Sequence, residues 1–281
     1  MVQPSKLRIR LVPALLLSLL LAITSWGGQQ ADNRISTPEQ LKADFASVPC
    51  KNDDRLAGAR ALFEKMGAPA ADISIDKYKS VENLVVRKKG ASEEKIVIGA
   101  HYDKVPEGCG AVDNWTGIVT LAHLYKTLKD VPLKKTLLFI AFGKEEKGLI
   151  GSHEMVAALK PEEFGLYCEM INIDSFGLAA PQVLENASSK KLTSLAAELA
   201  KQMKMPFSSN RVDLADADSS SFVKKGIPGV TLHGLSNDFM TIIHTHKDQS
   251  SKINPLSVYL GYRLALALTV RLSETPCGAY K

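Results

Sequence analysis

The sequence predicts an α/β protein whose mixed, mostly parallel sheet is sandwiched between helices. Short apolar runs at 95–100, 136–142 and 169–174 have the length of buried strands. Segments with helical spacing, such as 115–128 and 149–159, separate these runs. Strands that alternate with helices form a parallel sheet that is covered on both faces.

The remaining elements follow in chain order. An amphipathic helix is predicted at 53–67, where Gly67 ends it and Pro69 follows. Residues 73–78 and 83–88 alternate apolar and polar side chains, which predicts two strands with one solvated face, at an antiparallel edge of the sheet. The same patterns predict a strand at 229–232 and helices at 190–203, 219–225 and 255–272.

The first 31 residues have the pattern of a secretory signal peptide. Three basic residues precede an apolar run at 11–23, which is too short to span a bilayer comfortably. An uncleaved membrane anchor is the alternative. We therefore predict a signal peptide at 1–31, a single domain at 32–281, a secreted or periplasmic location, and no stable membrane association after cleavage.

Charge and cysteine content limit the partners and the cross-links. Removing the three basic residues of the predicted signal from the formal charge of +5 leaves about +2. No Lys/Arg run with interleaved aromatic residues occurs, so nucleic-acid binding is not predicted. Four cysteines allow three pairings. A Cys109–Cys168 bridge is disfavoured, because the two residues lie at opposite ends of a predicted strand about 20 Å long.

Histidine and acidic residues follow the predicted strands, at the point where each strand ends. Ligands bind beyond the carboxyl ends of strands in such sheets. A hydrolytic metal pair needs imidazole and carboxylate ligands, a carboxylate that touches both ions, and a free carboxylate as base. The candidates are His101, Asp113, Glu146, Asp174 and His244 as metal ligands, Asp103 as the partner that orients His101, and Glu145 as the base.

These residues stand in motifs that resemble the di-zinc aminopeptidase family (peptidase family M28, clan MH). The matching segments are His101-Tyr102-Asp103, Gly110–Gly117, Glu145–Ser152, Asn172-Ile173-Asp174 and His244–Asp248. The resemblance implies one zinc ion held by His101, Asp113 and Asp174. It implies a second zinc ion held by Asp113, Glu146 and His244, with Glu145 as general base. An exported exopeptidase that removes N-terminal residues from peptides or acts on a small amide is therefore expected.

Alternatives remain open at this stage. A single-zinc glutaminyl cyclase resembles the same motif set, although it typically has Asp-Ser-Ala where this chain has Asp113-Asn114-Trp115. A non-catalytic binding domain on the same fold is a third hypothesis. His246 competes with His244 as the last ligand, and His233 is a candidate for lining the cleft. The acidic cluster 213–218 is expected to form a solvated loop and helix cap.

Overall fold

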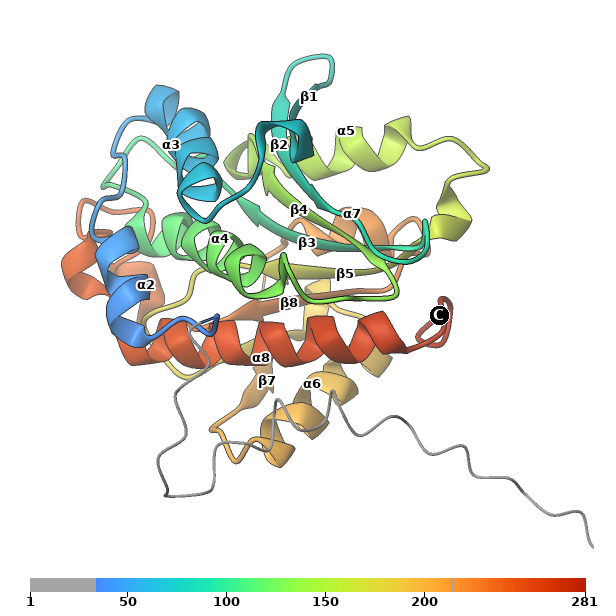
Figure 1. The fold of residues 1–281 in the computed structure, drawn as a ribbon. Coiled ribbons are helices and arrows are strands. Elements are labelled where there is room, and N and C mark those ends of the chain that lie inside the picture. The colour runs from blue at the N-terminus through green and yellow to red at the C-terminus, as the bar shows by residue number, and fades with distance from the viewer. Residues whose placement is uncertain (1–33, 214) are drawn as a thin grey trace, which may run out of the picture. The chain divides into compact units, whose positions relative to one another are not determined.

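One eight-stranded sheet forms the centre of the protein, in the strand order β1-β2-β4-β3-β5-β8-β6-β7 (Figure 1). The computed structural model describes residues 34–213 and 215–281. The strands are β1 (Ile73–Lys77), β2 (Glu82–Lys88), β3 (Lys95–His101), β4 (Thr136–Phe142), β5 (Tyr167–Ile173), β6 (Gln182–Leu184), β7 (Ser208–Asn210) and β8 (Gly229–His233).

The middle of this sheet is parallel and its flanks are mixed. Strands β4, β3, β5 and β8 are parallel neighbours, and their residues are almost all buried. Strand β2 runs antiparallel to β4, β1 to β2, and β6 to β8. The prediction of a mixed, mostly parallel sheet with an antiparallel edge is confirmed.

Helices cover both faces of the sheet. They are α2 (Pro38–Phe45), α3 (Asn52–Lys65), α4 (Thr116–Leu128), α5 (Ile150–Ala158), α6 (Lys190–Gln202), α7 (Ser219–Val223) and α8 (Pro255–Glu274). Helices α2, α3, α4 and α8 gather on one face, and α5 and α7 lie on the other (Figure 1). The central parallel strands β4, β3, β5 and β8 are thus covered on both sides, which explains their continuous apolar sequences.

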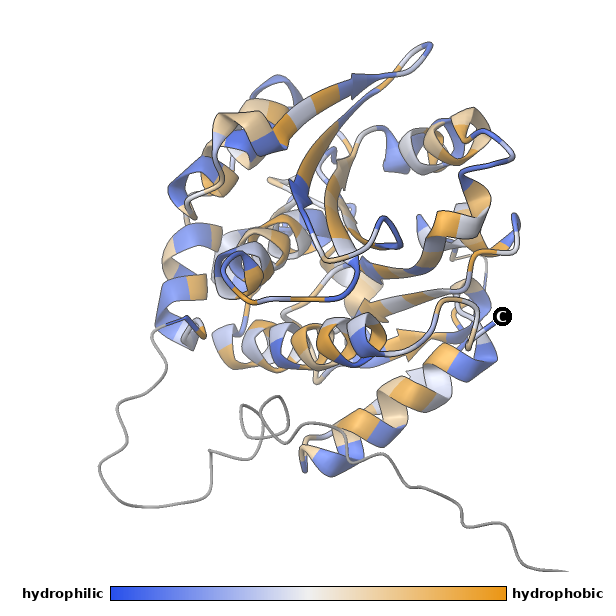
Figure 2. Ribbon diagram, turned by 45° about the vertical axis from the view of Figure 1, so that its right-hand side comes forward, coloured by the Kyte–Doolittle hydropathy of each residue, from blue (hydrophilic) through white to orange (hydrophobic). Residues whose placement is uncertain are grey.

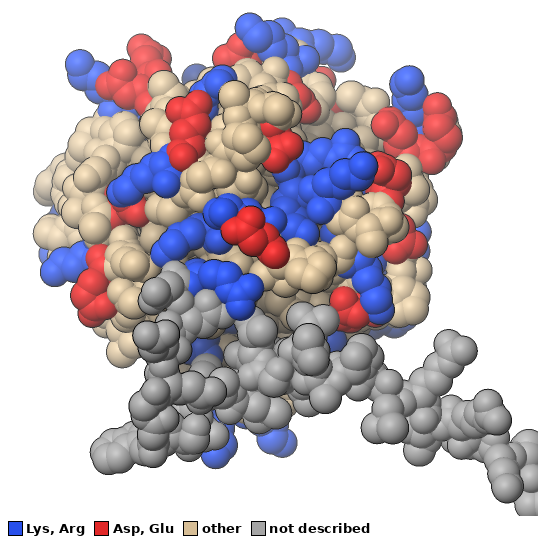
Figure 3. Space-filling model, in the orientation of Figure 1, with Lys and Arg blue, Asp and Glu red and all other residues tan. Residues whose placement is uncertain are grey.

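Alternate residues of each strand enter two separate apolar layers. On the α5 side, Leu138, Ile140 and Phe142 of β4 pack with α5 and with Phe222 of α7. On the α4 side, Phe139 packs between Phe63 of α3 and Tyr125 of α4. Apolar residues concentrate in the strands and on the inner faces of the helices (Figure 2). On the face that Figure 3 draws, basic and acidic side chains are interspersed.

Three short elements were not predicted from the sequence. Strands β6 and β7 have three residues each, which is too short for a period to show, and β7 is also polar. Helix α2 did carry a signal. Thr37 and Gln40 form a capping box around Pro38, which is a sequence signature of a helix start.

Both possible disulfides are formed, between Cys50 and Cys109 and between Cys168 and Cys277. Cys109 does not pair with Cys168, as predicted from the length of β5. The first bridge links the chain just before α3 to the loop after β3. The second links the start of β5 to the chain after α8.

His123 belongs to a buried Ser–His–Asp arrangement on the α2–α4 side. Its Nδ1 lies 2.7 Å from Ser36 Oγ and its Nε2 lies 2.9 Å from Asp44 Oδ2. Ser36 is 1% exposed, so its hydroxyl is not accessible to a substrate. The arrangement anchors the chain before α2 to α4 and gives His123 a structural role.

The predicted signal peptide, at 1–31, lies outside the described residues. Among residues 34–213 and 215–281, no helix combines the length and apolar content needed to cross a membrane.

A buried ion pair links the starts of β4 and β5. Lys135 Nζ donates to Glu169 Oε2 at 3.0 Å, and both side chains are almost fully buried. Burial raises the pKa of Glu169, and the ammonium of Lys135 opposes that rise. Each charge therefore depends on the other, since an uncompensated buried charge is costly.

Removing one partner should destabilise the protein more than removing an exposed pair. We expect Lys135→Met to lower the free energy of unfolding by about 3–5 kcal/mol, measured by urea denaturation. The control is Arg60→Met, which breaks the exposed Arg60–Glu64 pair and should cost less than about 1 kcal/mol. Equal losses in the two variants would show that Lys135 does not compensate the buried carboxylate.

Candidate metal centre

The predicted site residues converge where the central parallel strands end. His101 is the last residue of β3, and Glu145 and Glu146 begin a 3-10 turn just after β4. Asp174 follows β5, and His244 lies in the loop after β8. The carboxyl ends of parallel strands meet at one edge of a sheet, so residues far apart in the sequence become neighbours there.

Asp113 connects two groups of donors. His101 Nε2 lies 3.1 Å from Asp113 Oδ1 and 3.5 Å from Asp174 Oδ1. His244 Nε2 lies 2.9 Å from Asp113 Oδ2 and 3.2 Å from Glu146 Oε2. Each oxygen of the Asp113 carboxylate therefore faces a different imidazole. This is the placement that a carboxylate shared by two metal ions requires.

The backbone around Asp113 is fixed from two directions. Asp248 accepts hydrogen bonds from the N–H groups of Val112 and Asp113, at 2.7 and 3.2 Å. Gly110 adopts a left-handed conformation with φ of 57°, and a Cβ there would lie 2.8 Å from the Asp113 carbonyl oxygen. Only glycine adopts this conformation at no cost and leaves room for that carbonyl.

Asn114 and Ser175 join the Asp113 segment to the end of β5. The Asn114 side chain donates to the Ile173 carbonyl at 2.8 Å and accepts from the Ser175 N–H at 3.0 Å. Ser175 Oγ donates to Asp113 Oδ1 at 3.2 Å and to Asp174 Oδ1 at 3.1 Å. The two carboxylates are thereby held by a common hydroxyl.

Asp103 contacts His101 mainly through its main chain. His101 Nδ1 donates to the Asp103 carbonyl oxygen at 3.1 Å, whereas the nearest carboxylate oxygen lies 3.7 Å away. In the neutral imidazole this bond leaves the Nε2 lone pair free for a metal. The carboxylate instead accepts the N–H groups of Glu145 and Glu146, at 2.9 and 3.3 Å. Asp103 therefore holds the turn that carries both glutamates.

Glu145 and Glu146 differ in their contacts. Glu146 Oε2 faces His244, and Glu146 Oε1 is buried without a hydrogen-bond partner among the described residues. The Glu145 carboxylate takes no hydrogen bond from the described residues. Burial raises the pKa of Glu145 well above its usual value, and the charge of His101 opposes the rise. Adjacent carboxylates thus have separate surroundings.

The two histidines are basic because carboxylates surround them. Hydrogen bonds with Asp113 and Glu146 raise the pKa of His244 to about 10. Burial disfavours the charge on His101, but the carboxylates around it, including Glu145 and Asp113, outweigh burial and raise its pKa. A protonated His244 therefore offsets part of the negative charge of the carboxylates around it.

The residues fit a divalent metal ion. Nitrogen or oxygen donors of His101, Asp113 and Glu146 lie within 4.8 Å of one another. The buried Glu146 Oε1 has no partner among the residues described, and a metal would supply one. Imidazole and carboxylate are the donors that zinc takes in hydrolytic sites.

The structure separates the competing histidines. His246 is exposed and forms no ion pair within the described part of the chain, whereas His244 faces Asp113 and Glu146. His233 is buried, with Nε2 3.0 Å from Asn210 Oδ1, and burial lowers its pKa to about 4. Its ring is thus used to connect β8 to β7.

The sequence interpretation of the acidic cluster 213–218 was wrong for Asp218. Asp213 and Asp216 are exposed, but Asp218 is fully buried; it occupies the N-cap position of α7, although its side chain forms no capping hydrogen bond there. Burial raises its pKa to about 7, although the charge of His101 opposes the rise. No pattern in this polar segment distinguishes the buried aspartate from its neighbours.

Two further residues lie near the centre. Asp248 lies in one of the motifs quoted above, but its contact with the Asp113 segment could be recognised only in the folded structure. Lys144 donates to the Ser80 carbonyl oxygen in the β1–β2 turn. Its ammonium is therefore held at that turn.

This fold, with imidazole and carboxylate donors clustered where its parallel strands end, is the arrangement of the metallopeptidase class. The chain belongs to Peptidase family M28, because the model of that family matches residues 83–268, which is more than half of the chain. The resemblance inferred from the motifs is confirmed.

Curated relatives are much longer than this chain. Aminopeptidase YwaD of Bacillus subtilis is 40% identical over 82 residues, which cover 29% of this chain and 18% of that protein. The matched stretches of the first curated relatives span about a fifth of their length. The likeness therefore concerns one part of each relative.

Solved structures share the fold. LapA aminopeptidase of Legionella pneumophila has a TM-score of 0.71 at 21% identity, covering 97% of this chain and 78% of that one. BSAP, a zinc aminopeptidase from Bacillus subtilis, has a TM-score of 0.63 at 24% identity, covering 70% and 51%. A glutaminyl cyclase from an Acidobacteriales bacterium has a TM-score of 0.72 at 16% identity, covering 89% and 99%. At these identities the likeness shows the fold alone.

The raised histidine pKa values predict a pH-dependent metal affinity. The pKa of His244, about 10, leaves this imidazole protonated at neutral pH when no metal is bound, the pKa of His101 is raised as well, and an imidazole must lose its proton to bind metal. Zinc affinity should therefore rise with pH, about tenfold per pH unit for each proton displaced. Isothermal titration calorimetry in buffers of different ionisation enthalpy measures both the affinity and the protons released.

Two variants make this measurement specific. His244→Ala should release about one proton fewer per chain and bind zinc more weakly. His153→Ala, which removes an exposed histidine of α5, should match the unmodified protein. An affinity that is the same at about pH 6 and pH 8 would contradict protonated ligands.

Proposed function

We propose that this protein is an exported, zinc-dependent aminopeptidase that hydrolyses the N-terminal residue from peptides. One observation carries the proposal: the Asp113 carboxylate lies between His101 and His244, while the neighbouring Glu145 carboxylate has no hydrogen bond from the described residues. A two-metal hydrolytic centre needs a carboxylate that touches both ions, which fits Asp113. It also needs a free carboxylate as its base, which fits Glu145.

Each side chain has an assigned part. His101, Asp113 and Asp174 would hold one zinc ion, and Asp113, Glu146 and His244 would hold the other. Zinc, when bound, supplies Lewis acidity that makes water nucleophilic near neutral pH and polarises a carbonyl group. A match to the family of a zinc aminopeptidase supports this choice of metal.

Glu145 is the proposed general base. It takes a proton from the attacking water and delivers it to the leaving amine. Its burial raises its pKa toward the range in which a base works best near neutral pH. Asp103 acts as a positioning residue, because its carboxylate holds the N–H groups of Glu145 and Glu146.

Export is part of the proposal. Two disulfides join four cysteines, and no free cysteine remains. Disulfides persist in secreted and periplasmic proteins and are rare in reducing compartments. The basic and apolar pattern of the first 31 residues agrees with this location.

Replacing the proposed base should remove catalysis and leave metal binding intact. We expect Glu145→Gln to lower kcat by about 10²–10⁴-fold, because the amide cannot accept the proton. Zinc content, measured by elemental analysis after dialysis, should be unchanged. Glu162→Gln, an exposed carboxylate, is the matched control and should retain full activity. A Glu145→Gln enzyme with near-normal kcat would exclude the assigned role.

The main alternative is a glutaminyl cyclase with one zinc ion. The cyclase fold noted above matches this chain over 99% of the cyclase's own length, so size does not separate the two activities. The shared position of Asp113 favours two ions. A cyclase releases ammonia from an N-terminal glutamine, whereas an aminopeptidase releases a free amino acid.

A substrate panel with zinc counting separates these functions. The expected result is hydrolysis of peptides with a free N-terminus, no hydrolysis of their N-acetylated forms, and two zinc ions per chain. Ring closure of glutaminyl peptides with one zinc ion per chain would establish the cyclase. No turnover of either class by the zinc-loaded protein would favour the non-catalytic alternative.

A further inference from the structure

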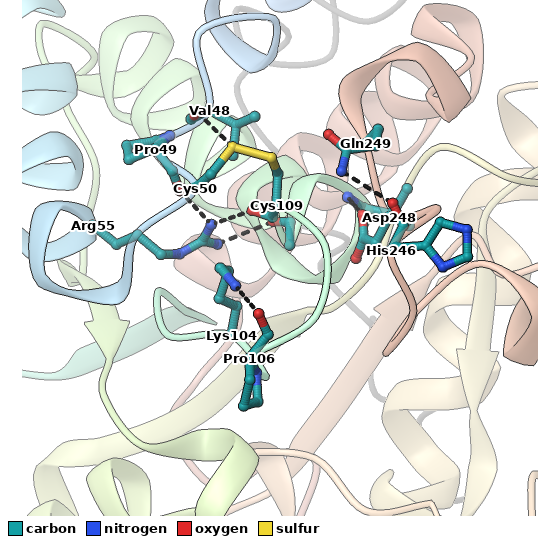
Figure 4. The surroundings of a disulfide bond; sticks show 12 residues. Val48, Pro49, Cys50, Arg55, Lys104, Pro106, Cys109, His246, Asp248 and Gln249 are labelled. Carbon is teal, nitrogen blue, oxygen red and sulfur yellow. Dashed lines mark hydrogen bonds between the residues drawn. A yellow bond between two sulfur atoms is a disulfide. The ribbon is translucent and has the colours of Figure 1, made fainter.

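The first turn of α3 makes an unusual number of polar contacts with the segment between His101 and Asp113. Arg55 of α3 is fully buried and stacks its guanidinium over the ring of Trp115, 5.1 Å from the ring centroid. Figure 4 shows it pointing into the loop that ends at Cys109. Helix α3 lies outside the residues that the family model matches.

The guanidinium of Arg55 donates to four backbone carbonyl groups. Its Nε donates to Tyr102, which follows His101 directly. Its remaining nitrogens donate to Pro49 at 3.0 Å, to Cys109 at 2.9 Å and to Gly110 at 3.1 Å. One rigid planar group thus fixes both ends of the 102–110 segment.

Two more contacts with this segment come from Asn52, which begins α3, and from Cys50 just before it. Asn52 donates to the Lys104 carbonyl at 2.8 Å and accepts from the Lys104 N–H at 3.0 Å. The Cys50–Cys109 disulfide adds a covalent link (Figure 4). We call Cys50, Asn52 and Arg55 together the α3 clamp.

Arg55 is also a permanent cation close to the acidic centre. It forms no ion pair within 4 Å of a carboxylate in the described part of the chain. Burial lowers its pKa to about 10, and the charges of Asp103 and Asp113 oppose this shift, so the group stays protonated at neutral pH. A buried cation without a direct partner is costly unless surrounding charge and hydrogen bonds stabilise it. Carbonyl groups and nearby carboxylates provide that stabilisation here.

We propose that Arg55 is a positioning residue that raises the zinc affinity of the centre by fixing the segment from Tyr102 to Gly110. The inference rests on the proposed metal site. His101 and Asp113 flank this segment, so their relative position depends on its conformation. The contacts of Asn52 and Cys50 hold the same segment, so they too should raise the zinc affinity.

The test measures zinc affinity, by competition with a chromophoric chelator, on the full disulfide-bonded chain. We expect Arg55→Lys to weaken zinc binding about 10- to 100-fold, the range seen when residues that orient metal ligands are changed. Lysine keeps the charge but cannot span four carbonyl groups from three segments. Asn52→Ala alters an exposed residue, so it should fold normally, and it should weaken zinc binding less, in the same direction.

Two controls separate positioning from general destabilisation. Arg60→Lys changes a half-exposed arginine of the same helix that pairs with Glu64, and it should leave the zinc affinity unchanged. Leu62→Ala removes a core side chain of α3 and should lower the free energy of unfolding without a comparable loss of zinc affinity. A loss in Leu62→Ala equal to that in Arg55→Lys would overturn the proposal.

The outcomes also separate this inference from the proposed function. If the unmodified chain binds zinc and both Arg55→Lys and Asn52→Ala bind it equally well, the α3 clamp has no positioning role and the metal site stands. If the unmodified chain binds no zinc, the metal site and the inference fall together.

Discussion

The cluster of carboxylates at one edge of the sheet constrains the rest of the structure. Asp113, Asp174, Glu145, Glu146 and Asp218 meet there in surroundings that exclude much of the water. Burial raises the pKa of Glu145, Glu146 and Asp218. Isolated buried carboxylates would be neutralised by protonation or would weaken the fold. Here His101, His244 and Arg55 supply positive charge, and the donor set suits divalent cations. The same crowding that suits the centre to a metal ion thus also makes these buried charges costly without compensation.

Much of this arrangement could be predicted from the sequence, because apolar periodicity fixes where the parallel strands end. Strand β4 has the predicted bounds, and the glutamates after it lie where the sheet edge places them. The segment between β8 and His244 has no apolar periodicity, so the position of His244 could be predicted only from the motif resemblance. Asp218 was mispredicted because the burial of a polar residue is decided by tertiary contacts. The sequence does contain a signal for the buried position of Arg55. Arg55 shares the helical spacing of Ala59, Leu62 and Phe63, the buried face of α3, where an arginine is out of place unless its donors are satisfied.

Glu145 and Glu146 illustrate how adjacent residues obtain different chemistry. Both N–H groups bond to the Asp103 carboxylate, so the turn is held by a residue that itself follows β3. From this common support the Glu146 side chain reaches His244, while the Glu145 side chain remains without a hydrogen bond from the described residues. The proposed base and a proposed metal ligand can therefore be neighbours in sequence without competing for the same position. The Asp103 carboxylate holds the turn of the two glutamates, and its carbonyl oxygen orients His101. One residue thus links β3, β4 and both glutamates.

The two halves of the centre are mechanically joined. His244 and Asp248 belong to one loop, and Asp248 bonds to the N–H of Asp113, whose carboxylate faces both histidines. The Cys109 N–H donates to the Asp248 carbonyl at 2.8 Å, so the α3 clamp reaches this loop as well. A displacement of the 102–110 segment would therefore move the surroundings of both histidines together. In the two-metal centre proposed above, a change in affinity at one position would therefore be expected to accompany a change at the other. A centre built in this way would favour simultaneous occupancy by the two ions that the proposed peptidase chemistry requires.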